Sequence, residues 1–358
     1  MKKLSLALAA SAAVLLSCGV ASAQDKMKAC FIYVGPIGDF GWSYQHHQGA
    51  LAMQKALGGE EKVEIAYLES VPEGADAERA IERFARSGCK IIFTTSFGYM
   101  DATNAVAAKF PDVKFEHATG FKREHPNVST YNSKFHEGRY IQGVIAAKMS
   151  QKGEAGYIAS FPIPEVVMGI DAFMLGAQSV NPAFKLKIVW ANTWFDPGKE
   201  ADAAKVLIDQ GVDIITQHTD STAPMQVATE RGIKAFGQAS DMIKFGEKTQ
   251  LTAIVDDWGP YYTQRVKELM DGTYKQSDTW HGLKEGNVAM APYTNMPDDV
   301  KALAEATQKK IVDGFNPFTG PVSKQDGTEW LKDGAVAPDG ELLGLNFYVK
   351  GVEGDLPK

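Results

Sequence analysis

Short apolar runs alternate with amphipathic segments along most of the chain. Runs rich in β-branched and aromatic residues occur at 28–34, 63–68, 90–95, 113–117, 155–160, 186–191, 213–217, 235–239 and 251–255. The segments between them carry apolar residues at helical spacing, and in one of these Ala77, Ile81 and Phe84 share a face. Strands that alternate with helices predict an α/β fold whose parallel sheets are covered by helices on both faces.

The alternation is interrupted once and then starts again. Segment 136–149 has apolar residues at helical spacing, and a second strand–helix set of similar size follows it. Because the chain is longer than one hydrophobic core usually serves, we expect two doubly wound lobes. The expected first lobe comprises 24–150 and about 253–315, and the second comprises 151–252 and about 316–358.

The N-terminal segment 1–23 has the features of a secretory signal peptide. Two lysines precede the apolar stretch 4–16, and Ala21-Ser22-Ala23 places small residues before a cleavage site at Gln24. An alternative is that Leu15-Leu16-Ser17-Cys18 acts as a lipobox and that Cys18 becomes a lipid anchor. Both alternatives predict an exported protein, located in the periplasm.

The remaining composition limits the possible partners and cross-links. A net charge of −7 offers no basic surface for nucleic acid. Cys30 and Cys89 lie at the starts of the first and third strands, which are neighbours in a doubly wound sheet. We therefore expect the two cysteines to lie close together, either as a disulfide or as two buried thiols.

Motifs of catalysis or metal binding are not found. Gly35, Gly38 and Gly41 are not spaced as a dinucleotide-binding loop, and the sequence contains no P-loop, nucleophile elbow or zinc-binding helix. His46 and His47 are adjacent, so on a helix they point in different directions. We predict no catalytic residue, no metal and no cofactor.

Aromatic, carboxylate and hydroxyl side chains instead recur in the loops that follow the strands. Open α/β sheets bind ligands at these carboxyl ends. The candidate ligand-binding residues are Asp39, Phe40, Trp42, Ser43, Phe97, Tyr99, Trp194, Asp220, Ser221, Asp241, Asp256 and Trp258. Trp42 and Trp194 fall on equivalent loops of the two lobes, which suits a flat aromatic ligand held between two rings. Asp side chains suit its amine or ring N–H groups.

These loops resemble those of the basic membrane protein (BMP) family of ABC-transporter substrate-binding proteins, whose characterised members bind purine nucleosides. The similar segments are Asp39 to Ser43 with Gly49, Thr193 to Asp196, Tyr140 to Ala147, Gly237 to Asp241, and Phe347 to Val352. The resemblance implies a type I periplasmic-binding-protein fold with a hinge and a central cleft, in which three segments of chain cross between the lobes. It also implies that Trp42 and Trp194 replace two phenylalanines that enclose the base, with Asp39 and Asp241 in the binding loops.

Two departures from the family bear on the ligand. Ser43 stands where the family has Asn, and Asp256 falls at about the place of a family lysine. The lost lysine favours a free base such as adenine over a purine nucleoside. We therefore expect a monomeric substrate-binding protein that delivers a purine to an ABC permease in the inner membrane. The alternative is a ligand-sensing or purine-processing protein on the same fold.

Overall fold

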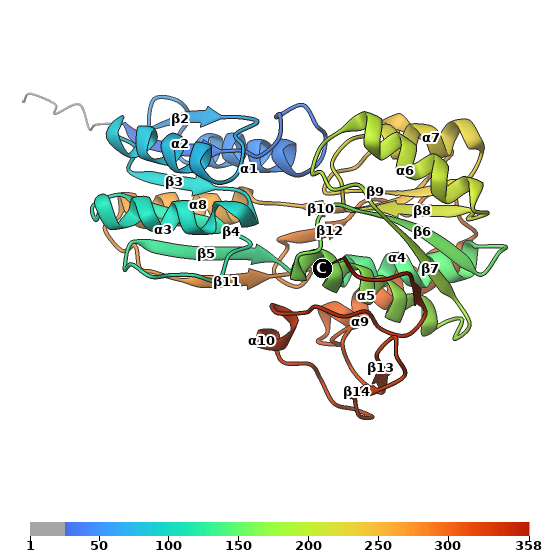
Figure 1. Ribbon diagram of the computed structural model, residues 1–358. Coiled ribbons are helices and arrows are strands. Elements are labelled where there is room, and N and C mark those ends of the chain that lie inside the picture. The colour runs from blue at the N-terminus through green and yellow to red at the C-terminus, as the bar shows by residue number, and fades with distance from the viewer. Residues whose placement is uncertain (1–25, 358) are drawn as a thin grey trace, which may run out of the picture.

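The computed structural model describes residues 26–357, which form two lobes side by side (Figure 1). The predicted signal peptide and Cys18 lie outside the described residues. In the first lobe six parallel strands follow the order β11-β5-β4-β3-β1-β2. Their bounds are β1 Met27–Ile32, β2 Val63–Leu68, β3 Ile91–Thr94, β4 Lys114–Ala118, β5 Val128–Ser133 and β11 Asp278–His281.

Helices cover both faces of the first sheet. The helices α2 (Ala75–Arg86) and α3 (Met100–Lys109) enclose one apolar cluster with the sheet, and α1 (Trp42–Ala56) and α8 (Gly259–Met270) enclose another on the opposite face. The short 3₁₀ helix η1 (Phe97–Tyr99) leads into α3. This arrangement confirms the α/β fold with parallel-sheet lobes that the alternating pattern predicts.

The second sheet contains seven strands in the order β12-β10-β9-β8-β6-β7-β15. The strands are β6 Glu154–Ala159, β7 Lys185–Trp190, β8 Ile214–Gln217, β9 Lys234–Gly237, β10 Gln250–Asp256, β12 Val288–Met290 and β15 Val352–Glu353. One face carries α4 (Phe135–Met149), α5 (Pro164–Gln178) and α9 (Asp298–Val312), and the other carries α6 (Pro197–Asp209) and α7 (Ala223–Arg231). A 3₁₀ helix, η2 (Ile243–Phe245), follows β9.

The lobe boundaries differ from those expected. Helix α4 packs against α5 and α9 in the core of the second lobe, so the first crossing falls between Ser133 and Phe135 and not near 150. Strand β10 pairs with β9, and therefore the chain returns to the first lobe only after Asp256. It crosses a third time between β11 and β12. Segment 298–312 consequently belongs to the second lobe and not to the first.

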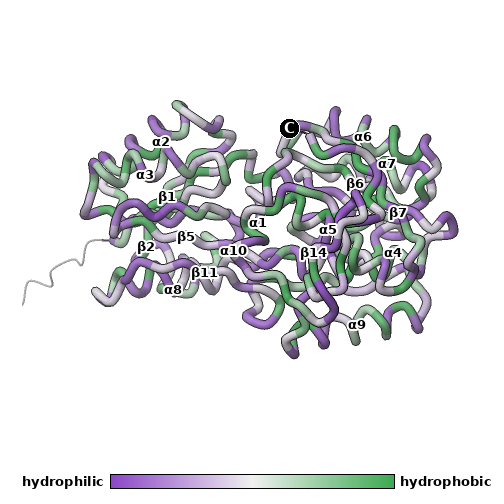
Figure 2. The backbone as a smooth tube through the Cα atoms, turned by 60° about the horizontal axis from the view of Figure 1, so that its bottom comes forward, coloured by the Kyte–Doolittle hydropathy of each residue, from purple (hydrophilic) through white to green (hydrophobic). Residues whose placement is uncertain are grey.

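The C-terminal segment packs on the second lobe. It contains β13 (Val322–Ser323), β14 (Glu329–Leu331) and α10 (Asp339–Leu342), and it contributes buried side chains to the same apolar cluster as α4 and α5. Figure 2 shows this segment on the second lobe and a narrow waist between the two lobes. No helix among residues 26–357 is long and apolar enough to span a membrane.

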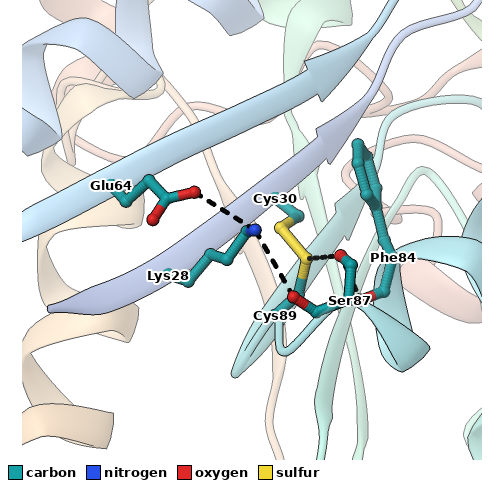
Figure 3. Close-up of a disulfide and its surroundings, with 6 residues drawn as sticks. All are labelled: Lys28, Cys30, Glu64, Phe84, Ser87 and Cys89. Carbon is teal, nitrogen blue, oxygen red and sulfur yellow. Dashed lines mark hydrogen bonds and ion pairs between the residues drawn. A yellow bond between two sulfur atoms is a disulfide. The ribbon is translucent and has the colours of Figure 1, made fainter. Parts of the chain in front are cut away.

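Cys30 and Cys89 form a disulfide, with 6.0 Å between their Cα atoms (Figure 3). The bond joins the middle of β1 to Cys89, which lies two residues before the adjacent strand β3. Beside it the Nζ of Lys28 lies 3.1 Å from Oε1 of Glu64 and donates to the carbonyl of Ser87. The expected closeness of the two cysteines is confirmed, and of the two alternatives the structure contains the disulfide.

Candidate functional site

A cavity lies between the lobes, at the carboxyl ends of strands from both sheets. The space that atoms leave empty there, including its opening to solvent, is about 370 Å³. The lining residues are Val34, Trp42, Ser96, Phe97 and Thr119 from the first lobe, and Glu165, Trp194, His218, Asp220 and Gln238 from the second.

The two expected tryptophans line this cavity from opposite lobes. Trp42 begins α1, and its indole N–H donates to the carbonyl oxygen of Thr95 over 2.6 Å. Trp194 follows β7, and its ring packs edge-on against Phe161 with 5.1 Å between centroids. No described residue accepts a hydrogen bond from the buried indole N–H of Trp194. Both rings thus border one space, as the sequence predicts.

The position of Trp42 is fixed from behind by a cluster of buried rings. His46, one turn further along α1, meets the indole of Trp42 edge-on at 4.3 Å. His46 in turn stacks on Trp258, with 4.6 Å between centroids and 13° between planes. Trp258 is buried in the first lobe and does not line the cavity, so it supports Trp42 through packing.

Asp39 and Ser43 hold the loop before α1 in shape and do not face the cavity. The buried carboxylate of Asp39 accepts hydrogen bonds from the backbone N–H groups of Gly41, Ser43 and Tyr44. The hydroxyl of Ser43 accepts one from the backbone N–H of Gly35. In this structure their contacts are with the loop itself, which positions Trp42.

The lobes touch directly beside the cavity. The backbone N–H of Trp42 donates to Oδ1 of Asp220 over 3.0 Å. A Cβ on Gly41 would come within 2.6 Å of the Asp220 side chain, so only glycine permits this approach. The carboxyl ends of the two sheets therefore meet, and the structure represents a closed arrangement.

Phe40 makes a second contact between the lobes. Its backbone has a φ of 62°, which is uncommon for a bulky residue. Its ring packs against Phe245 with 5.0 Å between centroids, and the Nζ of Lys244 lies 3.7 Å from its ring centre. The hydroxyl of Ser240 donates to the carbonyl of Phe40. Phe40 thus contacts the second lobe and lies outside the cavity lining.

Closure places carboxyl groups near one another. Burial raises the pKa of Asp220 well above its usual value, and the charge of Asp39 raises it further. Burial likewise raises the pKa of Asp39 from 3.8 to about 6, although three backbone N–H groups oppose the shift. In the cavity wall, burial raises the pKa of Glu165 to about 7, and the charge of Arg139 opposes this shift.

The remaining predicted residues lie elsewhere, except Phe97, which lines the cavity. Tyr99 is buried in the first lobe, and its hydroxyl donates to the carbonyl of Val71. The hydroxyl of Ser221 donates to Glu200. Asp241 accepts hydrogen bonds from the backbone of Ile243 and the side chain of Gln250. Asp256 is buried behind the cavity, and its carboxylate oxygens have no hydrogen-bond partner among residues 26–357.

Five polar or charged lining residues carry no motif that sequence reasoning could use. Ser96 and His218 lie in the same loops as the predicted residues Phe97 and Asp220, but neither of them is among the predicted residues. Glu165 lies at the start of α5, and Thr119 and Gln238 follow β4 and β9 directly. For the four residues other than Glu165, a position one or two residues after a strand end is the signal that could have found them. Among residues 26–357 no group of His, Cys, Asp or Glu side chains is arranged to hold a metal ion.

A family model and two relatives match most of the chain. The family model described as PnrA-like ABC transporter substrate-binding protein matches residues 26–316. The chain is 67% identical to a purine-binding protein of Brucella abortus, over 95% of this chain and 97% of that protein. It is 34% identical to a putative ABC transporter glucose-binding protein of Haloferax volcanii, over 95% of this chain and 83% of that protein.

Solved structures show the same fold. An ABC transporter solute-binding protein of Aeropyrum pernix K1 superposes with a TM-score of 0.71 at 20% identity, over 80% of this chain and 92% of that chain. A transcriptional activator of the comK gene from Bacillus halodurans superposes with a TM-score of 0.67 at 22% identity, covering 80% and 98%. Since this fold serves both transport and regulation, the fold alone does not choose between them.

Proposed function

Because the chain belongs to the family of PnrA-like ABC transporter substrate-binding proteins, we propose that it binds a purine in the cavity between its lobes. The observation that carries this proposal is the pair Trp42 and Trp194, which reach one cavity from opposite lobes. Two indole rings suit a flat heterocycle, and stacking on aromatic rings contributes roughly 1–3 kcal/mol per base. The name of the purine-binding relative in Brucella abortus supports the same ligand class.

The carboxyl groups in the cavity wall complement the edge of such a ring. Asp220 and Glu165 are lining residues, and the oxygens of carboxyl groups accept hydrogen bonds from exocyclic amines and ring N–H groups. Adenine presents such donors together with acceptor nitrogens. A buried polar ligand atom left without a partner costs about 1–3 kcal/mol, so the match of donors with acceptors decides which purine binds.

We favour a free base such as adenine over its nucleoside. A ribose adds hydroxyl groups that need partners inside the closed cleft, and no lysine or arginine is among the residues that line the cavity. The lobes also meet directly through Asp220 and the backbone of Trp42, which limits the space beside the base. These features support a ligand without a sugar.

In this proposal the protein works in the periplasm and hands its ligand to an ABC permease. Members of the family bind a substrate for transport and do not transform it. The lobes enclose the purine, and the closed form then docks on the membrane partner. The predicted signal peptide agrees with this location.

The test is calorimetric titration with adenine, adenosine, guanine and guanosine, with glucose as the control suggested by the haloarchaeal relative. We expect adenine to bind more tightly than adenosine and glucose not to bind. Mass spectrometry should recover the purine unchanged after incubation. Tighter binding of a nucleoside would contradict the preference for a base, and tight binding of glucose alone would overturn the purine proposal.

A further inference from the structure

Arg139 on α4 is fully buried behind the cavity and has no carboxylate among its hydrogen-bond partners. All of its bonded partners are neutral oxygens. They are the side chains of Gln142, Thr216 and Gln238 and the carbonyl of Gln217. Nη1 and Nη2 each donate to two of these oxygens and so fix the groups that carry them, whereas no described residue accepts a hydrogen bond from Nε.

The bond from Arg139 determines how the Gln238 side chain is turned. A guanidinium group only donates, so the atom of Gln238 that faces it must be the carbonyl oxygen. The amide NH₂ group then points away from Arg139. Gln238 lines the cavity, and no described residue accepts a hydrogen bond from this NH₂ group.

His218 directly follows β8, the neighbour of β9. A similar argument makes its ring a second hydrogen-bond donor. Its Nδ1 lies 3.3 Å from the hydroxyl of Tyr157, which has no other hydrogen-bond partner among residues 26–357. Burial raises the pKa of Tyr157 to about 12, so the hydroxyl keeps its proton and donates it to Nδ1. Burial, and secondarily the charge of Arg139, lowers the pKa of His218 well below its usual value. The neutral ring then carries its proton on Nε2.

We infer that Gln238, oriented by Arg139, is a specificity-determining residue that requires a hydrogen-bond acceptor on the ligand at the carboxyl end of β9. The inference rests on the proposed purine ligand and adds its orientation. An acceptor edge of the ring, bearing ring nitrogens, faces Gln238 and His218. The donor groups of the ring face the carboxyl groups of Asp220 and Glu165.

This arrangement removes an ambiguity that glutamine ordinarily has. A free amide can turn over and offer either its NH₂ group or its oxygen to the ligand. Here the carbonyl is already engaged by Arg139. A ligand that presents an amine to Gln238 would bring two hydrogen-bond donors together, with no acceptor between them. We expect such a ligand to be excluded.

Gln238→Glu separates this role from a purely structural one. A glutamate keeps an oxygen for Arg139, but it turns a second acceptor toward the cavity in place of the NH₂ group. We expect adenine to bind at least about tenfold more weakly, since a donor is lost and two acceptors are brought together. Gln226→Glu is the matched control, because Gln226 is exposed on the same lobe.

The titration series comprises adenine and its 1-deaza, 3-deaza and 7-deaza analogues, each of which lacks one acceptor nitrogen. In the wild-type protein we expect one analogue to bind about tenfold more weakly than adenine. In Gln238→Glu that analogue should bind as well as adenine does, or better. Unchanged adenine affinity in Gln238→Glu, or an analogue penalty that the substitution leaves intact, would overturn the inference.

A substitution of Arg139 tests its role in positioning Gln238. In Arg139→Met no donor faces the carbonyl oxygen of Gln238, so the amide can turn over, and the differences among the deaza analogues should shrink even where adenine still binds. If that variant does not fold, Gln238→Glu decides the matter alone. If the wild-type protein binds none of adenine, adenosine, guanine and guanosine, the proposed function itself fails. This result differs from one in which the wild type binds adenine but Gln238→Glu leaves the penalties of the deaza analogues unchanged.

Discussion

The backbone N–H of Trp42 in the first lobe donates a hydrogen bond to Oδ1 of Asp220 in the second, over 3.0 Å. The two groups lie 178 residues apart in sequence, and nothing but the approach of the lobes brings them together. The residue that borders the ligand cavity is therefore also one that joins the lobes. In the proposed function, this contact links affinity for the ligand with closure of the cleft.

Asp220→Ala should weaken purine binding by about 1–3 kcal/mol, because the N–H of Trp42 loses its acceptor. Asp220→Asn keeps an oxygen and should lose less. Calorimetry gives the affinities, and small-angle scattering with saturating ligand reports whether the lobes still close. Equal affinity in wild type and Asp220→Ala would show that the contact does not contribute to binding.

Replacing either cavity tryptophan should weaken binding. Trp42→Ala and Trp194→Ala are each expected to cost roughly 1–3 kcal/mol, the size of one stacking contact. Ligand should also change the tryptophan fluorescence of the wild-type protein. Trp330→Phe, in the C-terminal segment, is the control and should leave both the affinity and the fluorescence change intact. Loss in only one of the two alanine variants would mean that a single ring contacts the ligand.

Asp39 should make stability depend on pH in the mildly acidic range. Its pKa is about 6 in the folded protein against 3.8 as the ordinary value, so the folded state binds the proton more tightly. Stability therefore rises as pH falls through 6 toward 4 and is lost again as pH rises. Between pH 7 and pH 5 the wild type should gain about 1 kcal/mol relative to Asp39→Asn. Urea denaturation at both pH values measures this, and a difference that is constant with pH would contradict it.

Removing the disulfide should lower stability and leave ligand affinity unchanged. Cys30 and Cys89 close a loop with a sequence separation of 59, and bonds of this kind typically contribute about 2–4 kcal/mol. The bond lies in the middle of β1 and before the start of β3, whereas the cavity lies beyond the carboxyl ends of these strands. Thermal unfolding and titration of Cys30→Ser/Cys89→Ser with adenine test both halves. A weaker affinity in this variant would show that this part of the sheet also shapes the cleft.

Sequence patterns predict the elements with strong apolar periodicity. The strand at 63–68 agrees residue for residue with β2, and the helical segment at 136–149 agrees with α4 within one residue. Strand β5 is missed because Ser129, Thr130, Asn132 and Ser133 make it polar, although all four are buried. The hydroxyl groups of Ser129 and Thr130 find partners in other elements, as when Thr130 donates to Asp278, and such distant partners leave no local signal.

Only part of the candidate site can be predicted from the sequence, for a related reason. Trp42, Phe97, Trp194 and Asp220 are found because aromatic and acidic residues stand out in strand-end loops. Asp39, Ser43 and Ser221 share the same loops, yet their polar groups satisfy the loop backbone or Glu200. Whether a polar side chain turns toward the ligand or toward its own loop depends on backbone geometry that residue type does not encode.

Three separate segments connect the lobes, near 134, between 256 and 259, and between 281 and 288. Three covalent connections that run in parallel can bend together, but they resist sliding and twisting of one lobe against the other. We therefore expect the lobes to move by one rotation about these segments, with Phe40 seated against Lys244 and Phe245 in the closed position. In the proposed function, a permease that contacts both lobes would bind the closed position and not an open one.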